Sequence, residues 1–208
     1  VIERKCRLEV PERTLANGTV VKDVDEASIK AAAQELIAQG CDSVCLFFIN
    51  GYANTDNEIK AARILRQVWP NDYVSVATEI LPEIREFERC STASLNAYLQ
   101  PVVANYLARL ETRIAKDEAG SEILIVQSNG GIMSVDTAKA LPVRTALSGP
   151  AAGVVAARQI AKAAGFENVI TCDMGGTSFD VSLVADGQNM LTSQASIDFG
   201  MVIRTPMI

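Results

Sequence analysis

The sequence predicts an α/β protein in which a mixed sheet is flanked by helices. Two observations carry this prediction. Helical and strand-like patterns alternate from residue 25 to residue 173, and such alternation is typical of an α/β sheet. Several strand-like segments are continuous apolar runs, which are typical of strands covered on both faces. After residue 173 the pattern changes to short strands joined by tight turns, which predicts an antiparallel meander.

The first half of the chain contains two clear amphipathic helices. Residues 25–39 carry apolar side chains at helical spacing, Asp25 is a suitable N-cap, and a glycine follows the last residue. A second helix is expected to begin at Thr55, because Thr55 and Glu58 fit the capping-box pattern, and to end before Pro70.

The longest helical pattern covers residues 91–118. Its Leu, Tyr, Val and Ile side chains form a stripe that is more typical of core packing than of a ligand site. Pro101 lies inside the pattern, so the segment is either one long helix or a broken pair. The remaining elements are expected to be strands at 43–49, 73–77, 122–127, 143–147, 168–173, 178–184, 189–195 and 201–205, and helices at 136–140 and 151–164.

Composition and charge argue against two classes of partner. The 208-residue chain has a formal net charge of −6, and its Lys and Arg residues are scattered among acids, so we expect no nucleic-acid partner. No apolar run approaches the roughly 20 residues that a membrane-spanning helix needs, so we expect no membrane partner. The chain starts without an initiator Met or a signal pattern, so we expect an internal section of a longer, cytoplasmic protein.

The numbers of cysteines and histidines limit which disulfides, metal sites and catalytic groups the chain can form. The five cysteines are odd in number and lie mainly in apolar stretches, which indicates reduced thiols and no disulfides. Cys41 and Cys45 lie in a strand-like stretch, and the chain has no histidine to complete a zinc site with them. The absence of histidine also excludes Ser-His-Asp and Cys-His catalysis within this chain.

Three glycine-containing turns follow expected strands, at residues 128–131, 148–153 and 173–177. Ligands gather beyond the carboxyl ends of strands in open α/β sheets, so the three turns are candidates for one cleft. The second turn also opens a helix, whose N-terminal N–H groups and dipole favour anions. The alternative is that the glycines only punctuate the chain.

The third turn is the strongest candidate for a phosphate site. Asp173 ends an apolar strand, at a place where a hydrated Mg²⁺ beside a phosphate would need a carboxylate. The glycines let the N–H groups of Gly175, Gly176 and Thr177 point into one concavity that binds an anion. The chain contains neither the P-loop pattern nor G-x-G-x-x-G. The role of Asp180 is open, with hydrogen bonding to the hairpin backbone as one alternative.

Four ordered segments resemble the hydantoinase A and oxoprolinase family. They lie at residues 83–98, 126–134, 148–157 and 168–184, and the resemblance extends over most of the chain. The Asp-Met-Gly-Gly-Thr run at 173–177 by itself is similar only to the broader superfamily of actin, sugar kinases and heat-shock ATPases. The ordered set is therefore what makes the resemblance specific.

The resemblance implies an actin-like ATPase fold, in which two RNase H-like lobes hold ATP between them. Residues 1–149 would form the C-terminal part of the first lobe, from the hydantoinase/oxoprolinase N-terminal region into the start of the hydantoinase A domain. Residues 150–208 would supply the connecting helix and the phosphate-binding hairpin of the second lobe. The implied cofactors are ATP and Mg²⁺. The implied site residues are a catalytic, magnesium-binding Asp173 and, for ATP, Gly175, Gly176, Thr177, Ser178, Ser148 and Gly149.

The activity that the resemblance implies is ATP-dependent hydrolysis of a small cyclic amide, such as hydantoin or 5-oxoproline, with a hydantoinase B-type subunit or domain as partner. A subunit of an ATP-dependent acetone or acetophenone carboxylase is the closest alternative. A chaperone-like or filament-forming ATPase is an alternative of another class.

The chain departs from the family pattern in three ways. No Asp-x-Gly-Gly-Thr loop precedes residue 173, and the adenosine-binding glycine segment would follow residue 208. Asn57 stands where relatives often have histidine, which puts a metal or catalytic role there in doubt. The chain is therefore expected to hold half of an ATP site and to be inactive by itself.

Overall fold

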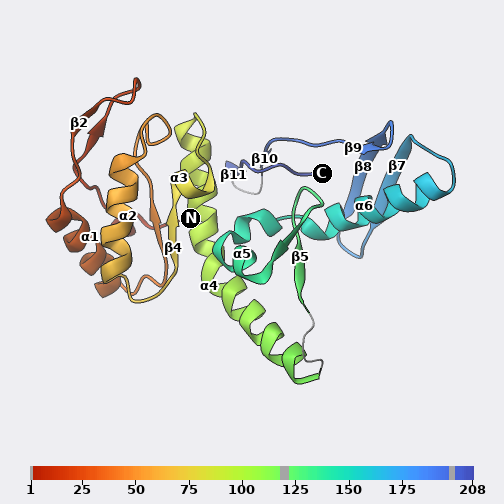
Figure 1. Cartoon of the computed structure of the whole chain (residues 1–208), viewed down its shortest axis with the longest axis horizontal. Helices are drawn as coiled ribbons and strands as arrows, with labels where there is room; N and C mark the ends of the chain where they lie inside the picture. The colour runs from red at the N-terminus through yellow and green to blue at the C-terminus, as the bar shows by residue number, and fades with distance from the viewer. Residues whose placement is uncertain (1, 118–121, 197–199) are drawn as a thin grey trace. The chain divides into compact units, whose positions relative to one another are not determined.

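The computed structural model describes residues 2–117, 122–196 and 200–208. It divides into two compact units, Val1–Val103 and Ala104–Ile208, here called the N-terminal and C-terminal units. Each unit combines helices with small sheets, which confirms the predicted α/β class (Figure 1). None of the helices in the described ranges combines the length and apolarity that crossing a bilayer requires.

The N-terminal unit is built around a two-stranded parallel sheet of β3 (Val44–Leu46) and β4 (Val74–Val76). Helices α1 (Glu26–Ala38) and α2 (Asp56–Val68) contact each other and share one apolar core with both strands. The unit also contains η1 (Arg4–Cys6), the antiparallel strands β1 (Arg13–Thr14) and β2 (Val20–Lys22), the short helix α3 (Ala77–Ile80) and the first part of α4 (Glu86–Asp117).

Helix α1 forms as predicted from its local signals. The Asp25 carboxylate accepts hydrogen bonds from the N–H groups of Ala27 and Ser28, at 2.8 and 3.2 Å. Gly40 follows the helix with a φ of +79°, a conformation that glycine adopts without strain. Both ends of α1 are thus specified by residues within or next to it.

Helix α2 also forms as predicted, but the prediction of a capping box at its start is wrong. The Thr55 side chain makes no cap hydrogen bond. The Glu58 carboxylate accepts hydrogen bonds from the N–H groups of Phe48, at 2.7 Å, and Thr78, at 3.0 Å. Because Glu58 is engaged by residues distant in the sequence, it does not reach back to cap its own helix.

A buried ion pair between Arg89 and Glu58 lies at the centre of the N-terminal unit. Neither side chain is exposed, and Arg89 Nη2 lies 3.4 Å from Glu58 Oε2. The guanidinium also donates to the carbonyl oxygens of Leu81 and Phe48, at 3.3 and 3.2 Å, and to Glu86 Oε2 at 3.1 Å. Burial raises the pKa of the Glu58 carboxyl, and its hydrogen-bond donors and Arg89 oppose that rise. The pair therefore ties α2 and α4 to the loops that follow β3 and α3.

Helix α4 is one continuous helix with Pro101 inside it, so the segment is not a broken pair. The predicted core stripe is only partly confirmed. Leu107 is 4% exposed, whereas Tyr98, Val102 and Tyr106 are 74%, 70% and 61% exposed. Helical spacing places these side chains on one face, but it does not determine whether another element covers that face.

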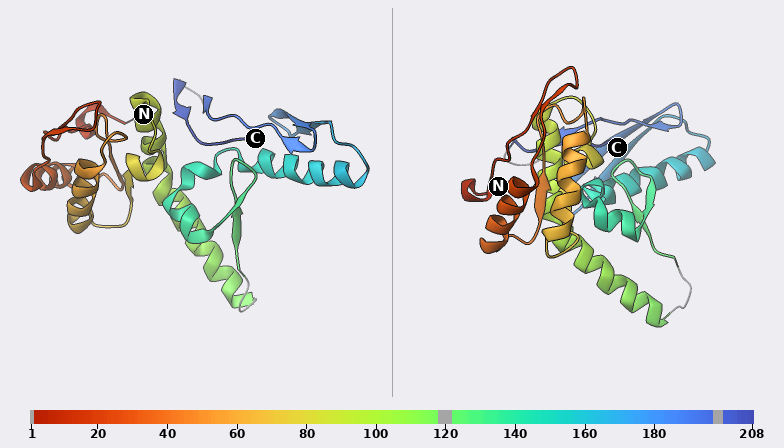
Figure 2. Two further views of the ribbon diagram at one scale, coloured as in Figure 1. Left: turned by 45° about the horizontal axis from the view of Figure 1, so that its top comes forward. Right: turned by 60° about the vertical axis from the view of Figure 1, so that its left-hand side comes forward.

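The C-terminal unit contains the last part of α4, several antiparallel strands and the helix α6 (Ser148–Ala163). Strands β7 (Val169–Met174) and β8 (Phe179–Ala185) form the predicted hairpin, and β9 (Gln188–Asn189) extends it. Helix α6 contacts all three strands and runs alongside the hairpin (Figures 1 and 2). The other elements are β5 (Leu124–Val126), β6 (Ile132–Ser134), α5 (Val135–Ala140), η2 (Pro142–Thr145), β10 (Ala195–Ser196) and β11 (Val202–Ile203).

The prediction of a strand at residues 143–147 is wrong, because most of this segment belongs to the 3-10 helix η2. Pro142 occupies the first turn of η2, where its fixed φ is favourable. The hydroxyl of the buried Ser128 lies 2.7 Å from the Arg144 carbonyl oxygen and 2.5 Å from that of Ala146. The Ser128 N–H group also donates to the Arg144 carbonyl oxygen at 2.8 Å, so the two donors of Ser128 satisfy these carbonyls in place of a neighbouring strand.

The turn predicted at Ser148 is the first turn of α6. The chain changes direction one residue earlier, at Leu147, whose φ of 60° lies in the left-handed region. The strands predicted at 189–195 and 201–205 are also shorter than expected, since they form only as β9, the start of β10 and β11.

Gly130, in the hairpin between β5 and β6, packs where no side chain fits. A Cβ added there would lie 2.6 Å from Val155 Cγ2 and 2.7 Å from Ile208 Cδ1. Its φ of +79° is also in the region that disfavours other residues. The turn at 128–131 thus serves the packing of the C-terminal unit.

Replacing Arg89 with Met is expected to lower the free energy of unfolding by about 3–5 kcal/mol, because Glu58 would stay buried without its counter-charge. Urea denaturation measures this loss. The matched control is Arg66→Ala, which removes an ion pair with Glu79 whose two side chains are each 47% exposed. The control is expected to cost less than about 1 kcal/mol, and equal losses in both variants would contradict the central place of the buried pair.

Replacing Gly130 with Ala is expected to cost about 1–2 kcal/mol for the left-handed backbone and about 1–3 kcal/mol more for the overpacked Cβ. Gly165→Ala is the matched control, because Gly165 has a φ of +86° and nothing within 4 Å of the added Cβ. The difference between the two variants, measured by thermal and urea unfolding, isolates the contact with Val155 and Ile208. Equal losses of stability in the two variants would show that the contact with Val155 and Ile208 does not restrict residue 130 to glycine.

Candidate functional site

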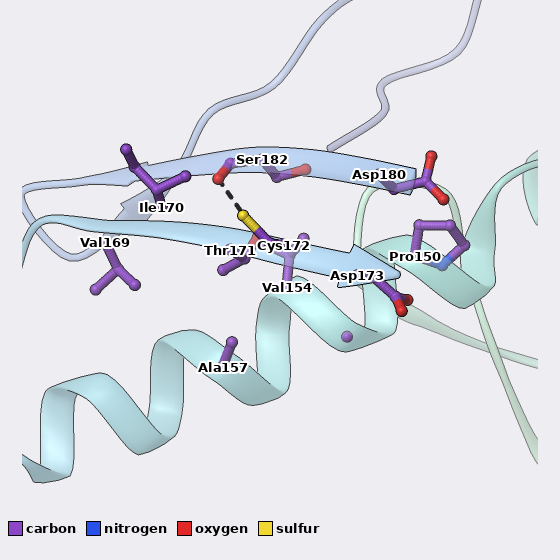
Figure 3. A pocket seen from close by; sticks show the side chains of 11 residues that line it. Pro150, Val154, Ala157, Val169, Ile170, Thr171, Cys172, Asp173, Asp180 and Ser182 are labelled. Carbon is purple, nitrogen blue, oxygen red and sulfur yellow. Dashed lines mark hydrogen bonds between the residues drawn. The ribbon is translucent and has the colours of Figure 1, made fainter. Parts of the chain in front are cut away.

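The inner face of the β7–β8 hairpin and helix α6 enclose a pocket of about 270 Å³ (Figure 3). Asp173 on β7 pairs directly with Asp180 on β8, and Thr171 pairs with Ser182. Because side chains alternate along a strand, these four belong to one face of the hairpin. The pocket is lined by Pro150, Gly153, Val154, Ala157, Val169, Ile170, Thr171, Cys172, Asp173, Asp180 and Ser182.

The side of α6 that lines the pocket carries the small residues Gly153 and Ala157. A Cβ added to Gly153 would lie 4.0 Å from Asp173 Oδ2. Asp173, Asp180 and Pro150 lie together at one end of the pocket, and Ala157 and Val169 lie toward the other (Figure 3). The glycine loop that follows Asp173 is thus at the N-terminal end of α6, where N–H groups and the helix dipole favour anions.

The loop between β7 and β8 differs in one detail from the expected anion-binding concavity. The N–H group of Gly175 donates to the Ser178 carbonyl oxygen at 3.0 Å and so closes the turn. Gly176 and Thr177 are exposed at the tip of the turn, and a Cβ added to Gly176 would meet nothing within 4 Å. An anion can therefore approach the backbone of Gly176 and Thr177, whereas Gly175 contributes mainly its turn geometry.

Two carboxylate residues, Asp173 and Asp180, are register partners across the hairpin. Directly opposed like charges in an antiparallel pair are unfavourable, and a bound cation would relieve the repulsion between Asp173 and Asp180. The Ser178 hydroxyl donates to Asp180 Oδ2 at 3.5 Å and helps to fix that side chain. Mg²⁺ commonly uses one or two carboxylates and completes its shell with water and phosphate oxygens. The residues present therefore fit a magnesium ion beside a phosphate.

No larger metal site competes with this pair. Across residues 2–117, 122–196 and 200–208, no group of three or more Cys, Asp or Glu side chains is arranged to hold a metal ion. The Cys41 and Cys45 pair in particular gains no further ligand there.

The start of α6 supplies a second set of backbone donors. Leu147 holds a left-handed conformation that is uncommon for a leucine, and such local strain is frequent at functional sites. It orients Ser148 and Gly149 as the first residues of α6, and a Cβ on Gly149 would meet nothing within 4 Å. The segment before them is held by Ser128, whose own N–H group donates to the Arg144 carbonyl oxygen at 2.8 Å.

The structure thus brings two of the three predicted glycine segments together. Residues 148–153 and 173–177 meet at the mouth of the pocket, while residues 128–131 support the connection into α6 through Ser128. The supporting role of Ser128 is not predicted by the sequence. Its neighbouring glycines suggested a turn, and nothing in its local sequence indicates hydrogen bonds to residues 16 and 18 positions later.

The segment at residues 83–98 is a packing motif. Arg89 and Asn96 are not exposed and Thr92 is 1% exposed. The Asn96 side chain donates to Ser75 Oγ at 2.9 Å, and Ser75 Oγ donates to Gln100 Oε1 at 2.9 Å. These contacts join α4 to β4 inside the N-terminal unit.

Asn57 is also buried and bound within the fold. Its side chain accepts a hydrogen bond from the Val24 N–H group at 3.1 Å and donates to the Lys22 carbonyl oxygen at 3.1 Å and to Glu12 Oε2 at 2.9 Å. These contacts attach α2 to the chain that leaves β2. A structural role therefore accounts for Asn57 in this chain.

Comparison with solved structures finds the same fold over nearly the whole chain. The crystal structure of an ATP-dependent caprolactamase from Pseudomonas jessenii matches with a TM-score of 0.81 and 32% identity, over 96% of this chain and 29% of that one. A nucleotide-free acetone carboxylase matches with a TM-score of 0.79 and 26% identity, over 95% of this chain and 28% of that one. These likenesses agree with the expected actin-like ATPase fold.

Sequence comparison identifies relatives of the same kind. Caprolactamase subunit alpha of Pseudomonas jessenii is 34% identical over 90% of this chain and 27% of its own length. The 5-oxoprolinase of Saccharomyces cerevisiae is 31% identical over 91% of this chain and 14% of its own length. The chain therefore spans less than a third of the length of the curated relatives that it matches.

Family models cover nearly all of the chain and agree with the resemblance seen in its motifs. The model for the hydantoinase/oxoprolinase N-terminal region matches residues 1–69. The hydantoinase/oxoprolinase model matches residues 89–208, which include the β7–β8 hairpin and α6. The chain belongs to the hydantoinase/oxoprolinase family.

Proposed function

We propose that this chain is part of an ATP-dependent hydrolase that opens small cyclic amides, and that the β7–β8 loop binds the nucleotide phosphates. The observation that carries the proposal is the position of Asp173, which lies at the mouth of the glycine loop and against the first turns of α6. The relatives support the substrate class, because caprolactam and 5-oxoproline are both cyclic amides.

The loop residues would share the work of binding phosphate. Asp173 would hold Mg²⁺ directly or through a water. The N–H groups of Gly176 and Thr177, together with the Ser178 hydroxyl, would contact phosphate oxygens. Gly175 would contribute by shaping the turn, since its N–H group already bonds to Ser178.

The start of α6 would complete the anion site from the other side of the pocket. Ser148 and Gly149 would direct N–H groups of the first helical turn toward the phosphates, with the helix dipole adding to the attraction. ATP supplies a phosphoryl group, and its transfer to the amide oxygen would make the ring carbon attackable by water. The contribution of this chain would be to position the phosphates and to neutralise their charge.

We also propose a hydantoinase B-type subunit or domain as the working partner, a division of the chain into lobes at residues 1–149 and 150–208, and a cytoplasmic location. The name of the caprolactamase relative supports the partner, because that protein is one subunit of an assembly. The five free cysteines support a reducing compartment.

A carboxylase subunit is the second candidate function, and the likeness to acetone carboxylase favours it. Both candidates would use the same phosphate loop, so the substrates separate them. The full-length protein with its partner would be supplied with hydantoin, 5-oxoproline or caprolactam in one series, and with acetone and bicarbonate in the other. ATP-coupled product in only one series assigns the function, whereas ATP hydrolysis stimulated only by unfolded peptide would indicate a chaperone-like ATPase.

Replacing Asp173 with Asn is expected to lower kcat for ATP-dependent amide hydrolysis about 10²–10³-fold, because the substitution keeps the shape and removes the charge that would hold the cation. Turnover is measured in the full-length protein at saturating ATP and Mg²⁺. Fluorescent nucleotide titration measures the accompanying loss of affinity.

The matched control is Asp186→Asn. Asp186 lies exposed in the turn after β8 with a φ of 49°, a conformation that asparagine tolerates. This variant is expected to keep the turnover of the unchanged protein. Equal turnover in the Asp173 variant would remove Asp173 from the mechanism.

A further inference from the structure

Ser128 lies where three segments of the C-terminal unit meet, and it is 2% exposed. Its N–H group donates to the Arg144 carbonyl oxygen at 2.8 Å, and its own carbonyl oxygen accepts a hydrogen bond from the Ile208 N–H group at 3.0 Å. Its hydroxyl lies 2.7 Å from the Arg144 carbonyl oxygen and 2.5 Å from the Ala146 carbonyl oxygen. Ser128 therefore joins the turn between β5 and β6 to the segment before α6 and to Ile208.

The Ser128 hydroxyl has one proton and two neighbouring acceptors. The Arg144 carbonyl oxygen already receives the Ser128 N–H group, and the Ala146 carbonyl oxygen is the nearer acceptor of the hydroxyl. The hydroxyl proton therefore belongs to the hydrogen bond with Ala146, the residue directly before Leu147.

Leu147 is held in a conformation that leucine seldom adopts. Its φ of 60° lies in the left-handed region, and such a conformation persists only where the surroundings determine it. Because a peptide group is planar, the hydrogen bond to the Ala146 carbonyl oxygen also fixes the plane that contains the Leu147 nitrogen. The Leu147 carbonyl oxygen accepts a hydrogen bond from the Ala151 N–H group at 3.2 Å. Both peptide groups that flank Leu147 are thus fixed, one of them by Ser128.

The turn at Leu147 sets the start of a helix that lines the pocket. Pro150 and Gly153, in the first turns of α6, line the pocket together with Asp173. A change in the direction of α6 at its start would move this wall relative to the loop that follows Asp173. Ser128 therefore acts on the pocket through α6.

We propose that Ser128 is a positioning residue for nucleotide binding, because its hydroxyl keeps Leu147 in the left-handed conformation and so holds the first turns of α6 in place. This role rests on the proposed function, in which the start of α6 and the loop after Asp173 share the phosphates. Ser128 itself contacts neither the phosphates nor the cation.

Ser134 offers a matched control in the same unit. Its hydroxyl oxygen accepts a hydrogen bond from the Thr137 N–H group at 3.3 Å and caps α5. Ser134→Ala removes a serine hydroxyl and a helix cap, which lowers stability, but it leaves the contacts of Ser128 in place.

The first test is the nucleotide affinity of the full-length protein, measured by titration with a fluorescent ATP analogue in the presence of Mg²⁺. Ser128→Ala is expected to weaken binding about tenfold, because the Ala146 carbonyl oxygen loses its donor and the left-handed conformation loses its support. Ser134→Ala is expected to bind as tightly as the unchanged protein, although urea unfolding shows both variants to be less stable. Equal affinity in Ser128→Ala and the unchanged protein would overturn the proposal.

A second substitution separates positioning from general support of the fold. Glycine adopts the left-handed conformation without strain, so Leu147→Gly keeps the turn without help from the hydroxyl. In that background, Ser128→Ala is expected to weaken binding only about twofold, because the two substitutions act on the same turn. The same weakening in both backgrounds would contradict an action through Leu147.

Hydrogen exchange needs no nucleotide, so it distinguishes failure of this role from failure of the proposed function. The Ala151 N–H group, which bonds to Leu147, is expected to exchange about tenfold faster in Ser128→Ala and at an unchanged rate in Ser134→Ala. Faster exchange with unaltered affinity would overturn the role of Ser128 in binding and leave the proposed function standing. A full-length protein that binds no nucleotide would overturn both.

Discussion

The N-terminal unit depends on one buried ion pair, between Arg89 and Glu58. The Arg89 guanidinium reaches carbonyl oxygens of Phe48 and Leu81 that belong to loops and have no strand or helix to satisfy them. An apolar side chain in place of Arg89 would remove this donor from the Leu81 carbonyl and the counter-charge from the buried Glu58, while the Phe48 carbonyl would keep the Gly51 N–H group at 3.2 Å. The rings of Phe47 and Tyr52 lie 5.2 and 5.9 Å from the guanidinium carbon and add cation–π contacts. Arg89 therefore acts as the scaffold for irregular backbone.

In the C-terminal unit, a neutral residue satisfies the carbonyl oxygens of irregular backbone. Ser128 supplies a donor to the carbonyls of Arg144 and Ala146, just before the chain turns at Leu147 into α6. That turn fixes where α6 begins, and Gly153 in its first turns lines the pocket beside Asp173. The start of α6, which lines the pocket beside the candidate phosphate loop, is thus held by the N–H group and the buried hydroxyl of Ser128.

Local signals explain which parts of this fold could be predicted. Asp25 caps α1 with its own neighbours, and the glycines after Asp173 specify a hairpin, so both were visible in the sequence. Glu58 looked like part of a capping box, but a tertiary partner claims its carboxylate. Tyr98 has the spacing of a core residue and is exposed, because spacing does not reveal what covers a face. The candidate site was found from local chemistry, whereas its support at Ser128 depends on long-range hydrogen bonds.

Electrostatics makes the proposed site dependent on a cation. Asp173 and Asp180 would repel phosphate oxygens as they repel each other, and the chain as a whole carries a net charge of −6. The N–H groups of Gly176 and Thr177 and the dipole of α6 offset only part of that repulsion, since a helix end is equivalent to roughly half an elementary charge. A divalent cation between carboxylates and phosphate reverses the sign of the local field. In the proposed function, nucleotide and Mg²⁺ therefore bind as one unit, and the two carboxylates prevent phosphate from occupying the loop without its metal.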